Sequence, residues 1–360
     1  MRIGIITFHR ANNYGAVLQC YALQSVLESL NYEVKVIDYR QPDTEEAYQP
    51  ISLTRIRKMV HTPVQFIKDI LLIPLRLRNA YGFNTFRNNY LNCTVPVCQP
   101  QNMPQDFDVY LLGSDQLWSI LCTGGHIEDV FWGNFKHPTK SIINGYAISA
   151  TISSLETIGS KRIKQNLCNF TNISLREESV ATWLQKQAKC ECRVDIDPTL
   201  LLDNIYWERL IKETKKLSTT PYLLSYYLMP NQKAIAKQYA KAYGLKYVEM
   251  GYVASSPIHF LALVKNATLI VGGSFHIAVF SIIFKKPFYV IRKGSGFDIR
   301  SEYLLNKLHL ENQMIDISSL PSKSPYLSIY YDDIDSKLQE LKKNSIEYLA
   351  SFNLSEAAKF

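Results

Sequence analysis

Leu269-Ile-Val-Gly-Gly-Ser-Phe-His-Ile-Ala-Val-Phe-Ser-Ile-Ile-Phe284 reads as a buried strand that turns on two glycines directly into a helix. Backbone N–H groups at a helix start have no partner within the helix and lie at the positive end of its dipole. An anionic group therefore binds readily at such a point. The stretch predicts an α/β fold and, where Ser274 and His276 open the helix, a site for an anion.

The same region carries no charged side chain from residue 266 to residue 284. A run of about 19 such residues is nearly long enough to cross a bilayer. Gly272, Gly273, Ser274 and His276 lie inside this run, and its first half is strand-like. These features favour a buried strand and helix over a membrane span.

The composition describes a globular chain with more than one domain. A length of 360 residues predicts two domains of about 150 residues each. A hydrophobic content of 47% with 20% charged residues excludes a disordered chain. The net charge of +8 is spread without a long basic block, which suits an anionic small substrate or membrane surface, and no nucleic-acid motif is present.

Cysteine usage indicates a reducing compartment. The seven cysteines are an odd set, and no signal peptide precedes the strand-like run at residues 2–7. We therefore expect free thiols in a cytoplasmic protein. Cys190-Glu-Cys192 alone lacks the spacing of a zinc site, so we expect no metal.

Apolar periodicity predicts a βαβ unit at the start of the chain, with strands at residues 3–8 and 33–39 around a helix. Further strand-like runs at residues 107–112, 141–148 and 172–175 favour a parallel sheet with covered faces. Together they predict an N-terminal Rossmann-like domain over residues 1–200.

The pattern restarts after residue 201. Strands are expected at residues 222–228, 246–250, 269–272 and 287–292, and helices at residues 232–243 and 256–266. This second α/β domain covers residues 201–331. From residue 332 an apolar helical face predicts a terminal helix over residues 332–360 that packs back on the first domain.

A basic helical insertion is expected at residues 50–105 of the first domain. Over residues 54–78, basic side chains alternate with large aliphatic ones. One interpretation is contact with an anionic bilayer or a lipid-linked acceptor. The other is an ordinary helical cap with solvated Arg and Lys.

Two residues at the expected sheet edges suit acid–base chemistry and anion binding. The imidazole of His276 titrates near neutral pH and can exchange a proton with a bound anion, or it can be a buried histidine bonded to a carbonyl. Arg176 follows a strand, where open α/β sheets bind ligands, and its planar fork suits a carboxylate or phosphate. The alternative is an ion pair of Arg176 with Glu177 or Glu178.

Other strand ends offer further candidates. Asp115 can act as a base on a sugar hydroxyl, with Trp118 as an apolar face for the ring, or it can cap a helix. Asn12 and Asn13 can present amides to a substrate or simply form a turn. Gly15 alone does not make a dinucleotide fingerprint.

Taken together, several motifs resemble the polysaccharide pyruvyl transferase family. They span most of the chain and are Asn13-Tyr-Gly-Ala-Val-Leu-Gln19, Gly113-Ser-Asp-Gln-Leu-Trp118, Ser174-Leu-Arg-Glu177, Asp197-Pro-Thr-Leu-Leu-Leu202, Ser274-Phe-His276 and Phe280-Ser-Ile-Ile-Phe284.

The resemblance implies two Rossmann-like domains facing across a cleft, as in GT-B glycosyltransferases. It implies a bacterial transferase that uses phosphoenolpyruvate as donor substrate, with no cofactor or metal. The donor's three-carbon unit would join two hydroxyls of one sugar in a capsule or exopolysaccharide precursor, giving a cyclic pyruvate ketal and phosphate. The acceptor would be a lipid-linked oligosaccharide, which leaves peripheral membrane contact open.

The resemblance also implies site residues. The expected catalytic residues are His276, Asp115 and Arg176. The expected donor-binding residues are Gly273, Ser274, Phe275, Arg300 and Ser149, and the expected acceptor-binding residues are Asn12, Asn13, Tyr14, Gly15, Ser114 and Trp118. The family more often has Thr-Asp before Ser-Phe-His, where this chain has Gly272-Gly273.

Two other functions fit the same pattern. One is a GT-B glycosyltransferase that uses a nucleotide sugar, since a fold alone does not fix a function. The other is a non-catalytic carbohydrate-binding assembly protein, which the missing acid before Ser274 would suit.

Overall fold

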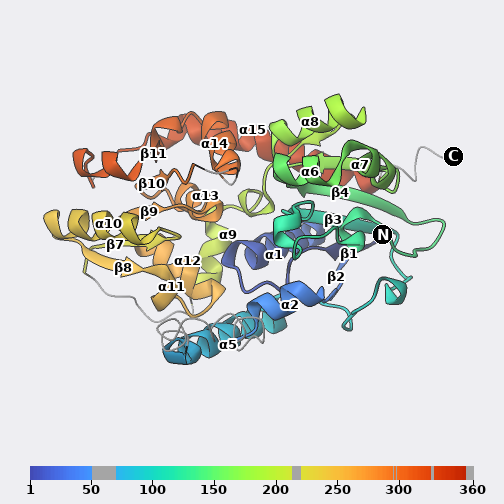
Figure 1. Ribbon diagram of the computed structural model, residues 1–360, viewed down its shortest axis with the longest axis horizontal. Helices are drawn as coiled ribbons and strands as arrows, with labels where there is room; N and C mark the ends of the chain where they lie inside the picture. The colour runs from blue at the N-terminus through green and yellow to red at the C-terminus, as the bar shows by residue number, and fades with distance from the viewer. Residues whose placement is uncertain (51–69, 213–219, 295, 297, 326–327, 354–360) are drawn as a thin grey trace. The chain divides into compact units, whose positions relative to one another are not determined.

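The computed structural model describes residues 1–50, 70–212, 220–294, 296, 298–325 and 328–353 (Figure 1). The chain divides into two compact α/β units. Unit 1 comprises Met1–Leu201 together with the chain from Ser345, and unit 2 comprises Leu202–Asn344. The predicted fold class, α/β with two Rossmann-like domains, is therefore confirmed.

Unit 1 is built on a six-stranded parallel sheet in the order β2-β1-β3-β4-β5-β6. The strands are β1 (Arg2–Ile6), β2 (Glu33–Val36), β3 (Val109–Asp115), β4 (Ile142–Ile148), β5 (Asn172–Leu175) and β6 (Arg193–Val194). The order of connection reverses between β1 and β3. Ligands of open α/β sheets bind outside the carboxyl ends of the strands at such a switch point.

Helices cover this sheet. They are α1 (Tyr14–Ser29), α2 (Pro42–Tyr48), α5 (Ile73–Tyr90), α6 (Ile152–Ile158), α7 (Ser160–Leu167) and α8 (Glu178–Ala188), with short 3-10 turns η1 (Pro100–Asn102), η2 (Ile120–Cys122), η3 (Asp129–Trp132) and η4 (Pro198–Leu200). Helix α1 is buried along 14 of its 16 residues, from Tyr14 to Leu27. Its N-cap is Asn13, whose side chain accepts hydrogen bonds from the backbone N–H groups of Gly15 and Ala16.

The predicted basic insertion is only partly visible. Residues 54–69 lie outside the described residues, so contact of this stretch with a membrane stays a prediction. Its described remainder leads into α5, which buries Phe83, Phe86 and Arg87. Leu77 and Tyr81 of α5 are exposed.

Unit 2 contains a five-stranded parallel sheet in the order β11-β10-β9-β7-β8. Its strands are β7 (Tyr222–Tyr226), β8 (Lys246–Glu249), β9 (Leu269–Gly272), β10 (Phe288–Ile291) and β11 (Met314–Ile315). Its helices are α9 (Asn204–Ile211), α10 (Pro230–Ala242), α11 (Met250–Val253), α12 (Pro257–Asn266), α13 (Phe275–Ile283) and α14 (Ile299–Lys307), with 3-10 turns η5 (Glu311–Gln313) and η6 (Ile317–Ser322).

The stretch at residues 269–284 forms β9 and α13, as predicted. Every residue of both elements is buried. β9 lies next to β7, where the order of connection in this sheet reverses. Among the described residues, no helix has the length and apolarity needed to cross a bilayer.

The last long helix, α15 (Tyr331–Ala350), passes from unit 2 into unit 1 and is followed by η7 (Ser351–Asn353). In unit 2 the hydroxyl of Tyr331 donates to the carbonyl of Lys286. In unit 1 the hydroxyl of Tyr348 donates to the carbonyl of Gly145 at 3.0 Å, and Tyr32 donates to the carbonyl of Leu349 at 3.0 Å. The helix thus packs back on the N-terminal unit.

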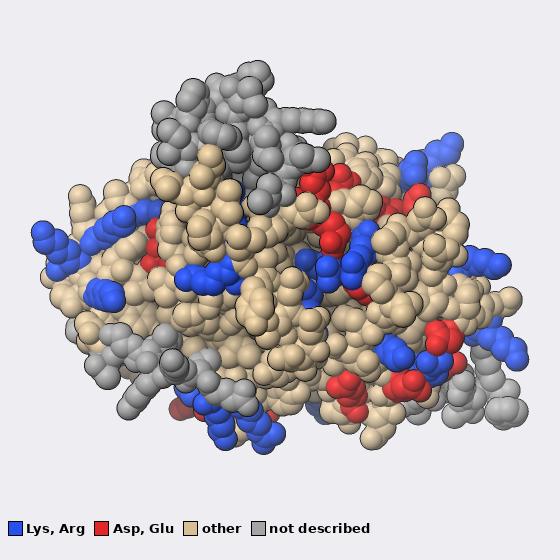
Figure 2. All heavy atoms as spheres, turned by 90° about the horizontal axis from the view of Figure 1, so that it is seen from below, with Lys and Arg blue, Asp and Glu red and all other residues tan. Residues whose placement is uncertain are grey.

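On the face shown in Figure 2, Lys and Arg side chains are scattered over uncharged surface, with Asp and Glu side chains beside some of them, and the described residues form no continuous basic block there.

We expect Tyr348→Phe to lower the free energy of unfolding by about 1 kcal/mol, because it leaves the ring in place and removes one buried hydrogen bond to Gly145. Urea unfolding followed by tryptophan fluorescence measures this change. The matched control is Tyr330→Phe, since Tyr330 is 87% exposed. Equal unfolding midpoints for the two variants would show that the hydrogen bond contributes nothing.

Candidate functional site

Arg176 is the centre of a buried polar cluster at the carboxyl edge of the unit 1 sheet. Its Nη1 donates to Oδ2 of Asp197 at 2.6 Å and its Nε donates to Oε1 of Glu177 at 3.2 Å. Its Nη2 lies 3.7 Å from Oδ1 of Asp115. The Arg176 side chain is 3% exposed. Burial alone would lower the pKa of Arg176, but the charges of Glu177, Asp197 and Asp115 raise it above its usual value.

The cluster corrects two predictions about donor binding. The guanidinium of Arg176 is buried among carboxylates, and it does not present a planar fork to an incoming anion. Ser149 is fully buried, and its hydroxyl donates to Oε1 of Glu177 at 2.7 Å. Both side chains therefore position their neighbours, and direct contact with the donor does not fit their surroundings.

Asp115 is the more accessible member of this edge. Its side chain is 15% exposed, and its Oδ1 accepts a hydrogen bond from the backbone N–H of Gln116 at 2.8 Å. Its φ of 102° is rare for a residue with a side chain. Such a conformation costs about 1–3 kcal/mol and persists where the surroundings enforce it, often at functional sites. Asp115 is the last residue of β3, and a turn without a regular helix follows it, so the alternative role of Asp115 as a helix cap does not apply.

Trp118 does not line a sugar site, contrary to the prediction. Its ring is 1% exposed and stacks on Trp132 with centroids 4.4 Å apart. Its Nε1 donates to the carbonyl of Phe131 at 2.9 Å. Because both faces and the polar atom are engaged in the core, the prediction for Trp118 is wrong.

Ser114 and Tyr14 are also structural. Ser114 is fully buried, and its hydroxyl donates to the carbonyl of Ala147 at 2.9 Å. Tyr14 is 6% exposed and stacks on Phe83. These two side chains pack within the fold, so the prediction that they bind the acceptor is wrong.

The predicted Asn-Asn-Tyr-Gly loop is likewise held by internal contacts. Asn13 is the N-cap of α1 and accepts a hydrogen bond from the backbone N–H of Gly15, a structural role that neither interpretation of this residue predicted. Asn12 accepts a hydrogen bond from Nη2 of Arg87 at 2.8 Å and donates to the carbonyl of Tyr48 at 3.2 Å. The loop thus has a fixed shape, and its asparagine amides are used to keep it.

In unit 2, the start of α13 is surrounded by cationic side chains. Ser274 is the N-cap and makes no side-chain hydrogen bond to the helix. The guanidinium carbon of Arg300 lies 5.7 Å from the ring centre of Phe275. His276 is 7% exposed, and its ring makes a T-shaped contact with the ring of Phe275, with the ring centres 5.1 Å apart. These four predicted residues are therefore grouped in one place.

Lys293 is a member of this group that the sequence did not reveal. A Cβ added to Gly273 would lie 2.6 Å from Cε and 3.4 Å from Nζ of Lys293, so this lysine side chain, in its present position, lies directly against Gly273. The ammonium lies 5.1 Å from the ring centre of Tyr227 and makes no hydrogen bond or ion pair with any described residue. The one hint in the sequence was Gly272-Gly273. Gly273 stands where the family more often has an aspartate, and it leaves space for another side chain.

The surroundings of Lys293 favour an anion. Burial lowers the pKa of Lys293, Asp298 opposes this effect, and Arg300 adds to it. Asp298 accepts hydrogen bonds from the backbone N–H groups of Lys293 and Gly294 and so fixes the turn after β10. Two half-buried cations next to a helix start form a site for a phosphate or carboxylate.

The potential metal ligands are the His, Cys, Asp and Glu side chains in the described parts of the chain. There, no group of three or more His, Cys, Asp or Glu side chains is arranged to hold a metal ion. Cys190 and Cys192 lie 3.6 Å apart, sulfur to sulfur, as free thiols.

Comparison with known proteins gives one family. The model of the polysaccharide pyruvyl transferase family matches residues 13–293. None of the curated proteins matches the chain.

Solved structures with a similar fold include the UDP-GlcNAc 2-epimerase of Neisseria meningitidis bound to UDP-GlcNAc, with 10% sequence identity, a TM-score of 0.51 and 100% of both chains covered. Another is a putative UDP-N-acetylglucosamine 2-epimerase from Listeria monocytogenes, with 9% identity, a TM-score of 0.52, and 98% of this chain and 95% of that chain covered. At these identities the likeness shows the fold alone, which is GT-B-like.

We expect Asp197→Asn to destabilise the protein by about 3–5 kcal/mol, because it leaves the buried guanidinium of Arg176 without its shortest charged partner. Chemical unfolding measures the loss. The control is Asp129→Asn, which breaks an exposed ion pair with Arg162 and should cost less than about 1 kcal/mol. Similar losses in both variants would contradict a structural role for the Arg176 cluster.

Proposed function

Because this chain belongs to the polysaccharide pyruvyl transferase family, we propose that it moves the enolpyruvyl unit of phosphoenolpyruvate onto two hydroxyls of one sugar in a cell-surface polysaccharide precursor. The product would be a cyclic pyruvate ketal, with release of phosphate. Pyruvylation of polysaccharide is the general activity that the family indicates. The specific donor is supported by one observation above all, the cationic surroundings of the α13 start in unit 2.

Phosphoenolpyruvate carries a phosphate and a carboxylate, and unit 2 offers partners for both. The backbone N–H groups at the start of α13 suit a phosphate. Lys293 and Arg300 add two positive charges beside it. Burial lowers the pKa of Lys293 because it disfavours the charged ammonium, and a bound anion would stabilise that ammonium.

The reaction needs one proton donor and one proton acceptor. Protonation of the methylene carbon of phosphoenolpyruvate makes the neighbouring carbon electrophilic, and a sugar hydroxyl attacks it. Loss of phosphate and attack by the second hydroxyl then close the ketal. Of the two hydroxyl protons, one ends on the new methyl group and the other on the released phosphate, so no redox partner is required.

We assign the proton transfers to His276 and Asp115. Imidazole serves as both acid and base near neutral pH, and His276 lies in the first turn of α13. Asp115 is the accessible carboxylate at the unit 1 sheet edge, and it acts as base on an acceptor hydroxyl. Arg176, 3.7 Å from Asp115, is a positioning residue that holds this carboxylate in place.

The acceptor is proposed to be a lipid-linked oligosaccharide. Trp118 and Ser114 are excluded as its contacts by their burial. The rival function, transfer from a nucleotide sugar, is tested directly by calorimetry. Tight binding of UDP without binding of phosphoenolpyruvate would replace our proposal with that one.

Purified protein incubated with phosphoenolpyruvate and a panel of lipid-linked saccharides should release phosphate and add one pyruvate ketal to the acceptor by mass. His276→Asn and Asp115→Asn should each lower kcat about 10²- to 10⁴-fold, the usual contribution of a general acid or base. Lys307→Gln, on the exposed end of α14, serves as the control. The proposal fails if no acceptor gains pyruvate mass.

The affinity for phosphoenolpyruvate should fall as the pH rises through the lowered pKa of Lys293, because the ammonium that binds the anion is then lost. The neighbouring phenol of Tyr227 does not mimic this effect, since burial raises its pKa. Calorimetric titration across alkaline pH measures the fall. In Lys293→Gln the affinity for phosphoenolpyruvate should be at least tenfold weaker at neutral pH and should not change with pH across this range. A pH profile of this variant equal to that of the wild type would exclude Lys293 from the site.

A further inference from the structure

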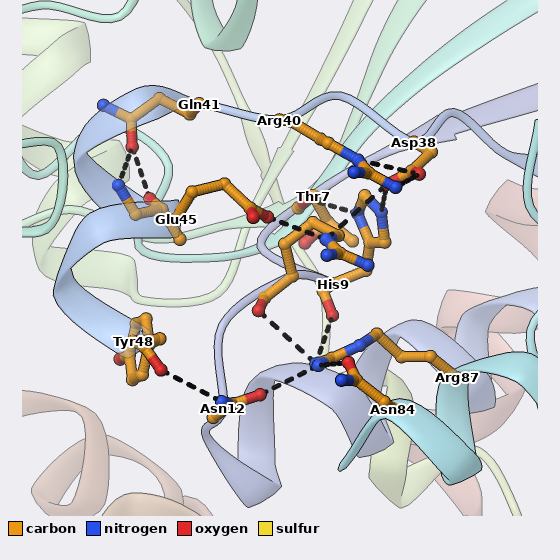
Figure 3. Close-up of polar contacts among 12 residues, drawn as sticks. Thr7, His9, Asn12, Asp38, Arg40, Gln41, Glu45, Tyr48, Asn84 and Arg87 are labelled. Atoms are coloured by element: carbon orange, nitrogen blue, oxygen red, sulfur yellow. Dashed lines mark hydrogen bonds and ion pairs between the residues drawn. The ribbon is translucent and has the colours of Figure 1, made fainter. Parts of the chain in front are cut away.

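We propose that the loop between β1 and α1 in unit 1 forms a second anion site, separate from α13, in which Arg10 binds a phosphate or diphosphate group. The site belongs to the loop cluster, which consists of His9, Arg10, Asp38, Arg40, Glu45 and Arg87. Figure 3 shows most of these side chains converging from the segments that follow β1 and β2 and from α2 and α5. Nothing in the proposed donor chemistry uses them.

Arg87 places a buried positive charge behind this loop without a carboxylate to balance it. The residue is 5% exposed. Its Nη1 donates to the carbonyls of His9 and Arg10, each at 3.4 Å, and its Nη2 donates to the amide oxygens of Asn12 at 2.8 Å and Asn84 at 2.7 Å (Figure 3). Its Nε has no hydrogen-bond partner among the described residues. Burial, followed by the charge of Arg10, lowers the pKa of Arg87 to about 10.

His9 lies behind the same loop. Its ring is fully buried, with Nδ1 3.1 Å from the carbonyl of Thr7 and Nε2 3.0 Å from Oδ1 of Asp38. Asp38 also accepts from Nε and Nη2 of Arg40, at 3.2 and 2.9 Å. The Asp38 carboxylate is thus shared by His9 and Arg40.

The charges of the loop cluster do not cancel. Arg10, Arg40 and Arg87 are positive, whereas Asp38 and Glu45 are the negative members. The excess is one positive charge in a half-buried place, where electrostatic fields are weakly screened. A protein core usually pairs its buried charges, because an unpaired one costs several kcal/mol. The missing negative charge is what an anionic ligand would bring.

Arg10 is the member that can reach such a ligand. Its Nε donates to Oε1 of Glu45 at 2.8 Å, which fixes the guanidinium. Its two amino nitrogens make no hydrogen bond to any described residue, and its side chain is 22% exposed. A guanidinium that is held in place and has unused N–H donors can bind two oxygens of one phosphate group.

The position of the loop supports the same conclusion. It follows β1 and precedes α1, next to β3, at the switch point of the sheet, where open α/β folds bind ligands. A purely structural role for Arg87, holding the loop shape, explains its contacts with Asn12 and the carbonyls. It does not explain why Arg10 adds a further positive charge at the same place.

Two sources of such an anion differ in their number of phosphate groups. If the proposed function holds, the natural ligand is the diphosphate that links the acceptor to its lipid carrier, and this identification rests on that function. Free phosphate is the other source. Both ligands bind through a phosphate group, and the affinity of the protein for each of them distinguishes the two sources.

Calorimetric titration of the full chain at low salt, without phosphoenolpyruvate, tests the site. Wild-type protein should bind inorganic pyrophosphate saturably, and Arg10→Gln should weaken this binding at least tenfold with an unchanged unfolding midpoint. Arg162→Gln is the matched control, since Arg162 is an exposed arginine of unit 1 in a long ion pair with Asp129. In Lys293→Gln, which removes a cation of the separate α13 site, the Arg10-dependent binding of pyrophosphate should remain.

Absence of saturable binding, wild-type affinity in Arg10→Gln, or loss of binding in Lys293→Gln would each overturn the proposal. Farnesyl diphosphate binding at least as tightly as pyrophosphate, with weaker binding of inorganic phosphate, would support the lipid carrier as source. Equal affinity for inorganic phosphate would support free phosphate in the same site. Because neither donor nor sugar is present, failure of pyruvyl transfer and failure of this site appear in different experiments.

Discussion

The buried charge of Arg176 organises the carboxyl edge of the N-terminal sheet. Its backbone N–H donates to the carbonyl of Ile148 at 3.0 Å, which joins β5 to the end of β4. Its side chain joins Asp197, Glu177 and Asp115, which lie on three separate segments of the chain. A buried charge with several short partners is costly to leave incomplete, so each partner is held in one place. The orientation of Asp115, on which the proposed chemistry depends, follows from this arrangement.

Two kinds of buried or half-buried cation can be told apart in this protein. Arg176 is surrounded by carboxylates, and its charge is satisfied within the fold. Lys293 and Arg87 have neutral or aromatic neighbours instead, and burial lowers the pKa of each. The first kind stabilises local geometry at the expense of ligand access. The second kind retains positive charge that an anion can neutralise, as is typical of binding sites.

Sequence periodicity was sufficient for the strand and helix at residues 269–284 and for the parallel sheets, because those patterns depend on neighbours along the chain. It was insufficient for Trp118, whose burial follows from stacking on Trp132 across a loop. It also missed Lys293, because this side chain meets Gly273 only when β9 and β10 pair. Arg176 was placed correctly at a strand end, but its partner Asp197 is 21 residues away. Contacts between distant segments therefore decided which candidates face solvent and which are structural.

Helix α15 gives the N-terminal unit a discontinuous sequence, since the unit takes up the chain again at Ser345 after all of unit 2. During synthesis, the first 201 residues therefore leave the ribosome well before Tyr348 and Leu349, which hydrogen-bond to Gly145 and Tyr32. Domains tend to fold as units in order of synthesis. In this protein, unit 1 completes its packing only after unit 2 has been synthesised, because the last segment of unit 1 follows unit 2 in the sequence.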